Sequence, residues 1–132
     1  MTRRILAGIV LLAVLACLAG CSSVSVGSFA SKYYNDDAYD DAVQEVIRYI
    51  KENFQGCTLK EIGYAGDAAV KVEAEARGLA PEQIIVLKTT FVTDKEDHHN
   101  GLEPDHTYED YMWILTRSTS ADLWEHKDHG YG

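Results

Sequence analysis

The sequence has few basic residues, and this shortage excludes one class of partner. Twelve lysines and arginines stand against 21 aspartates and glutamates in 132 residues, which gives a formal net charge of −9. A negatively charged protein is repelled by phosphate backbones, so nucleic acid is not an expected partner. The chain is also short, because a separately folding unit usually needs about 100–150 residues. The sequence therefore predicts a single domain.

No apolar run is long enough for a typical membrane-spanning helix, which needs about 20 residues. The longest run covers only residues 5–18, follows two arginines and stops at Gly20 and Cys21. A charged start, a short apolar run and small residues before a cut are typical of a cleaved export signal. Residues 1–20 are therefore predicted to be a signal peptide.

The four residues Leu18-Ala19-Gly20-Cys21 resemble the lipobox of bacterial lipoproteins. The resemblance implies cleavage between Gly20 and Cys21 and a diacylglyceryl group on Cys21. Several acyl chains on one residue hold a protein firmly at a membrane, because each buried methylene contributes about 0.8 kcal/mol. The expected location is the outer face of the cell membrane, or the outer membrane where one exists. An ordinary secretory signal and a twin-arginine signal are the alternatives.

Few cysteines remain in the predicted mature chain. Removal of residues 1–20 takes away two basic and no acidic residues, so the net charge becomes −11. Once Cys21 carries lipid, Cys57 is the only free cysteine, and an intramolecular disulfide is excluded. We interpret Cys57 as a buried structural thiol, since it starts an apolar segment and no pair of basic side chains lies nearby to lower its pKa. A reactive thiol or an intermolecular bridge is the alternative.

Hydrophobic periodicity predicts the elements that follow. Residues 21–37 are interpreted as the lipidated cysteine and a flexible tether, and residues 38–132 as the domain. Apolar residues at steps of three and four predict an amphipathic helix, and β-branched runs predict strands. The expected elements are a helix over 38–54, a strand over 57–64 with a bulge near Gly63, a helix over 67–77, a strand over 84–93, a loop over 94–107, and strands over 108–117 and 123–129.

This order predicts an α+β fold with two helices on one face of a curved antiparallel sheet of about four strands. Segments at residues 56–62, 85–91, 107–117, 123–124 and 129–131 resemble the bacterial lipoprotein family called domain of unknown function 4829. The most specific part is the strand with Trp113-Ile114-Leu115 and Arg117, followed by Trp124. The resemblance implies a cystatin-like fold of the nuclear-transport-factor-two type, and it implies no catalytic residue.

Histidine and carboxylate side chains gather in the last third of the chain, where such pairs can hold a divalent metal. The weak candidates His98, His99 and His106 lie in the polar loop, while His126 and His129 lie near the end. Their spacing matches no compact metal motif, so no metal and no cofactor are expected. Solvated loop histidines are the simpler interpretation.

The sequence lacks a nucleophile elbow, a phosphate loop and a metalloprotease helix, so an enzyme is not expected. Glu109, Asp110 and His126 are an acid–base set that facing strands could supply, with Glu109 and Asp110 on a solvent-facing edge as the simpler interpretation. A ligand pocket with aromatic walls is the competing hypothesis, with core filling as the simpler one; its candidate residues are Tyr64, Phe91, Tyr111, Trp113 and Trp124.

Taken together, these features predict a membrane-anchored, non-catalytic binding or interaction module of the cell envelope. The expected partners are the membrane, through the lipid on Cys21, and an envelope protein or small ligand. A carrier of a small ligand or a divalent metal is the alternative, and a small enzyme is the third class.

Overall fold

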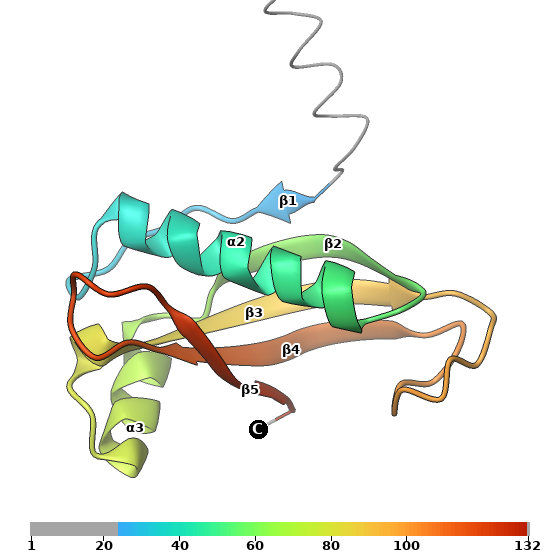
Figure 1. Cartoon of the computed structure of the whole chain (residues 1–132). Helices are drawn as coiled ribbons and strands as arrows, with labels where there is room; N and C mark the ends of the chain where they lie inside the picture. The colour runs from blue at the N-terminus through green and yellow to red at the C-terminus, as the bar shows by residue number, and fades with distance from the viewer. Residues whose placement is uncertain (1–23, 132) are drawn as a thin grey trace, which may run out of the picture.

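The computed structural model describes residues 24–131, so the predicted signal peptide and Cys21 lie outside the described residues. In this part of the chain, two helices and five strands follow one another (Figure 1). Within residues 24–131, no helix is long and apolar enough to cross a membrane. In chain order the elements are β1 (Ser25–Val26), α2 (Asp36–Asn53), β2 (Cys57–Tyr64), α3 (Asp67–Arg77), the 3-10 turn η1 (Pro81–Gln83), β3 (Ile84–Thr93), β4 (Thr107–Thr116) and β5 (Glu125–Gly130).

The strands form one sheet in the order β1-β2-β3-β4-β5. β1 pairs parallel to β2, and all other neighbours are antiparallel. The predicted α+β class is confirmed, with five strands in a mixed sheet where about four antiparallel strands were expected. The extra strand is β1, whose two residues are too few to show any periodicity.

Helix α2 begins at Asp36, two residues before the predicted start, directly after its capping residue Asn35. The Asn35 side chain accepts a hydrogen bond from the Ala38 amide at 2.9 Å, and Asp36 and Asp37 lie at the positive end of the helix dipole. The apolar stripe then faces the sheet, with Val43, Val46 and four further residues of the helix buried (Ala38, Tyr39, Ala42 and Ile50). Burial of this stripe is what holds the helix in place.

The two helices lie on opposite faces of the sheet, so the expectation of one shared face is wrong (Figure 1). Side chains alternate along β3, and the residues that face away from α2 are also apolar: Ile84 and Val86 have no exposed surface. Helix α3 covers this second face with Val70 and Ala74, both fully buried. A sheet strand that is apolar on both sides requires cover on both sides.

Helix α3 matches its predicted bounds, residues 67–77. Gly66 precedes the helix, and no side chain caps its first amides. The Asp67 carboxylate instead accepts hydrogen bonds from the Ser31 and Tyr64 hydroxyls, each at 2.6 Å. At the other end Gly78 adopts φ 67, the left-handed conformation that its lack of a side chain allows.

The segment expected as a tether packs onto the domain from Val24 onward. Phe29 stacks on Tyr39 of α2 with ring centroids 4.4 Å apart, and the Tyr39 hydroxyl donates to the Gly27 carbonyl at 3.1 Å. β1 adds hydrogen-bonded pairing with β2. The folded part therefore starts well before residue 38, because aromatic side chains in this polar segment find apolar partners in the core.

Bulges bend the sheet at three places. The bulge of β2 lies between Leu59 and Glu61, where the register against β3 shifts, rather than near Gly63 as expected. A second shift separates Thr89 and Phe91 in the pairing of β3 with β4, and a third separates Ile114 and Leu115 in the pairing of β4 with β5. Each extra residue resets which side chains face α2.

Candidate functional site

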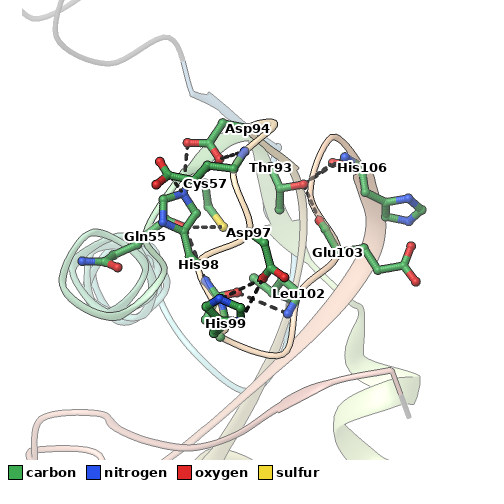
Figure 2. Close-up of polar contacts among 12 residues, drawn as sticks. Gln55, Cys57, Thr93, Asp94, Asp97, His98, His99, Leu102, Glu103 and His106 are labelled. Atoms are coloured by element: carbon green, nitrogen blue, oxygen red, sulfur yellow. Dashed lines mark hydrogen bonds and ion pairs between the residues drawn. The ribbon is translucent and has the colours of Figure 1, made fainter.

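The loop between β3 and β4 is fixed against the turn between α2 and β2 (Figure 2). The Asp94 amide donates to the Gly56 carbonyl at 2.9 Å, and the Asn100 side-chain amide donates to the Gln55 carbonyl at 3.4 Å. The Asp105 amide closes the loop on the Asp94 carbonyl at 2.6 Å. These bonds join segments about 40 residues apart and give the polar loop a defined shape.

Three metal-binding side chains come together at the start of this loop. One ligand atom from each of Asp94, Glu96 and His98 lies within 4.8 Å of the other two. His98 Nε2 lies 2.9 and 3.1 Å from the two Asp94 carboxylate oxygens and 4.0 Å from Glu96 Oε2. Figure 2 shows the His98 ring turned towards Asp94.

The burial of the three side chains differs. His98 is 19% exposed, whereas Asp94 is 49% and Glu96 is 78% exposed. One imidazole and two carboxylates suit a divalent transition metal, since imidazole and carboxylate are common zinc ligands. Water would have to fill the remaining positions, because the two carboxylates face solvent. The arrangement is therefore an open and weak site rather than a closed structural one.

Gly56 makes room for this cluster. A Cβ atom at residue 56 would lie 2.3 Å from His98 Nε2 and 2.7 Å from Asp94 Oδ2. The residue also has φ 74, a conformation that side-chain-bearing residues rarely adopt. Gly56, in the turn after α2, therefore leaves the space that the His98 ring and the Asp94 carboxylate occupy.

Of the three weak histidine candidates, the structure places only His98 in the cluster. His99 is 87% exposed and lies near Asp97, with 3.6 Å between Nδ1 and Oδ1. The His106 ring packs edge-on against Tyr108, and Figure 2 shows it pointing away from His98. Sequence reasoning missed Glu96. The signal that could have found it is the alternation of Asp94, Glu96 and His98, which lie two residues apart in the sequence.

Zinc binding at this cluster is expected to be weak, with a dissociation constant of micromolar or higher, because two of three ligands are solvated. Titration calorimetry of the full chain in detergent micelles measures this affinity. His98→Ala should weaken it at least tenfold, while His99→Ala should leave it unchanged because His99 lies outside the cluster. A stoichiometric site much tighter than micromolar, or equal affinities of the two variants, would contradict the expectation.

Cys57 lies beside this cluster and is half-buried. Burial raises the pKa of its thiol, and the negative charge of Asp94 raises it further. Both effects disfavour the thiolate, which is the reactive form. This environment agrees with a structural thiol.

The five aromatic pocket candidates are mostly enclosed by protein atoms. Phe91 and Trp113 have no exposed surface, and Tyr111 and Trp124 are 8% and 6% exposed. The Trp113 indole donates to the Thr89 hydroxyl at 2.8 Å, and the Trp124 indole donates to the Ala38 carbonyl at 2.9 Å. Tyr64, which is partly exposed, donates to Asp67. These residues therefore pack in or against the core, where their polar atoms form hydrogen bonds within the domain.

The acid–base set suggested by the sequence is not brought together. Asp110 is 80% exposed and lies 3.9 Å from the Lys88 ammonium, at the bulge of β4. Glu109 is exposed beside it. His126 instead packs against Tyr49 of α2, with ring centroids 4.1 Å apart. These residues do not share one cleft.

The fold and the loop thus define an α+β domain with an exposed histidine–carboxylate cluster. Comparison with known proteins finds no matching family model, no matching curated protein and no matching solved structure. The arguments about function therefore depend on the residues of this chain.

Proposed function

We propose that the chain is an exported lipoprotein, acylated at Cys21, whose α+β domain serves as a non-catalytic binding module at the cell envelope. Membership of the lipoprotein family that its segments resemble is part of this proposal. The lipobox-like residues 18–21 support the export and acylation steps. The exposed cluster of Asp94, Glu96 and His98 supports the binding role, since it places ligand atoms at the surface of the domain.

The single observation that carries the proposal is that folded structure begins only a few residues after Cys21 in the sequence. Pairing with β2 begins at Ser25, and only three peptide steps separate Cys21 from Val24. Three extended residues span about 10 Å. A lipid on Cys21 would therefore hold the domain directly against the membrane surface, without a long linker.

The same geometry orients the domain. Val24 lines a shallow cavity together with Gly56 and Cys57, and Gly56 in turn contacts Asp94 and His98. The β3–β4 loop thus lies at the end of the domain from which the chain leads to Cys21. An anchored domain would present this loop close to the membrane, where a partner or an ion near the headgroups can reach it.

Replacement of Cys21 by alanine tests the anchor. We expect the Cys21→Ala chain to lose labelling with radioactive palmitate and to move from the membrane pellet to the soluble fraction, because the acyl chains supply the attachment. Cys57→Ala is the matched control and should keep both label and location. Fractionation and autoradiography of both variants measure these outcomes.

The same strains test the binding module. An envelope protein recovered by crosslinking with the anchored chain, and lost with Cys21→Ala, is the expected result. A Cys21→Ala chain that stays in the pellet, with palmitate label absent from every variant, would refute the proposal.

A divalent-metal carrier is the second candidate function. The cluster of Asp94, Glu96 and His98 favours it, since its three ligand atoms already lie within 4.8 Å of one another. The zinc titration described above tests this candidate. A loss of zinc affinity in His98→Ala favours it, whereas no zinc binding at the cluster would leave the charged loop side chains with a role in solubility alone.

A further inference from the structure

Two histidines outside the loop cluster meet at the edge of the sheet. His129 Nδ1 and His126 Nε2 lie 3.0 Å apart, so the two ring nitrogens point at each other. Residues three apart in a regular strand face opposite sides. Here the register of β5 against β4 shifts between the pairs Ile114–Asp128 and Leu115–His126, which leaves Lys127 as an extra residue. This bulge turns both imidazoles to the face covered by α2.

Both rings are held by aromatic neighbours. The His126 ring centroid lies 4.1 Å from that of Tyr49. The His129 ring lies 5.0 Å from Trp113 and 5.4 Å from Phe54. Side chains fixed in this way lose little rotational freedom when they bind a ligand. The pair is thus organised before any ion arrives.

We infer that His126 and His129 form a second metal site, which takes an imidazole-preferring divalent ion such as Ni²⁺ or Cu²⁺ as a chelate between Nε2 and Nδ1. Such ions favour imidazole nitrogen over carboxylate oxygen. The ion would replace the single proton that the two facing nitrogens share. The site is separate from the cluster of Asp94, Glu96 and His98 and does not depend on the proposed function.

The distance between the nitrogens fits this chelate. With metal–nitrogen bonds of about 2.0–2.1 Å, two ligands at a right angle are separated by about 2.9 Å, and two tetrahedral ligands by about 3.3 Å. The observed 3.0 Å lies between these values. A metal ion can therefore enter with only a small movement of the rings.

Acidic side chains and solvent surround the pair. The carboxylates of Asp128 on β5 and Glu45 on α2 lie close enough to act on His126 electrostatically. Tyr49 packs on both rings, and Tyr111 stacks on His129 with ring centroids 6.0 Å apart. Both rings are only partly buried at the edge strand, so water can complete the coordination.

Ni²⁺ titration of the full chain, purified without an affinity tag in detergent micelles, tests the site. The imidazole resonances of His126 and His129 in ¹⁵N spectra should broaden with less than one equivalent of Ni²⁺, before those of His98, His99 and His106. This measurement needs no substitution. Broadening confined to the three loop histidines would overturn the inference.

Variants provide the second measurement. His129→Phe keeps an aromatic ring against Trp113 and should weaken Ni²⁺ binding at least tenfold in calorimetry. His98→Ala should leave the Ni²⁺ affinity of the His126–His129 pair unchanged. Equal Ni²⁺ affinity in His129→Phe and the unmodified chain would show that the pair is only a packed hydrogen bond. Should His129→Phe fail to fold, the spectra of the unmodified chain decide the question.

Discussion

Trp113→Ala is expected to lower the free energy of unfolding by about 3–5 kcal/mol, the usual cost of removing a large buried aromatic side chain. Trp113 has no exposed surface, and its indole donates to the Thr89 hydroxyl, which itself donates to the Tyr111 carbonyl. The alanine variant would leave a cavity between α2 and the sheet and break this chain of hydrogen bonds. Urea unfolding followed by far-UV circular dichroism measures the loss.

Leu123→Ala is the control for this substitution. Leu123 is a large apolar residue that is 82% exposed, so its removal should change the free energy of unfolding by no more than about 0.5 kcal/mol. A comparable loss in the two variants would mean that the packing around Trp113 is not the stabilising core described here.

Gly56→Ala is expected to damage both stability and zinc binding. The left-handed conformation costs a side-chain-bearing residue about 1–2 kcal/mol. In addition, the new Cβ would lie 2.3 Å from His98 Nε2 and 2.7 Å from Asp94 Oδ2, so these two ligands must move apart. Zinc affinity should therefore fall at least tenfold, as measured by calorimetry beside urea unfolding.

Gly101→Ala separates the two effects. Gly101 has φ 83, but no atom would lie within 4 Å of its Cβ. This variant should show a similar backbone penalty and retain the zinc affinity of the unmodified chain. If both glycine variants keep that affinity, the absence of a side chain at Gly56 is not required for zinc binding at the cluster.

Long elements with strong local signals could be predicted from the sequence. The bounds of β3 agree with the prediction because residues 84–93 are almost all β-branched or aromatic. The bounds of α3 agree because Gly78 provides a left-handed end and Arg77 precedes it. Helix α2 begins two residues earlier than expected, because its cap is Asn35 and the helix starts at the next residue.

Features that depend on tertiary contacts could not be predicted. The two residues of β1 gain their conformation only from β2, and Phe29 gains its place only from Tyr39. The separation of α2 and α3 onto opposite faces follows from the apolar residues on both sides of β3. A run of β-branched residues fits burial on one face or on two, so periodicity did not decide between them.

The candidate sites show the same limit. The sequence draws attention to the histidines, but it does not reveal that Gly56, some 40 residues before His98, supports its ring. The meeting of His126 with His129 depends on the bulge at Lys127, which arises from pairing with β4. Residues three apart in a strand would otherwise point away from each other.

The parallel pairing of β1 with β2 has a mechanical consequence. A pull on the amino terminus acts along β1, so it loads the Ser25–Glu61 and Val26–Ile62 pairs and the Gly27–Ile62 hydrogen bond together in shear. The Phe29–Tyr39 stack is the next contact to bear the force. Tension would therefore have to break the pairing of β1 with β2 and then the Phe29–Tyr39 contact before it acted on α2 and the rest of the sheet.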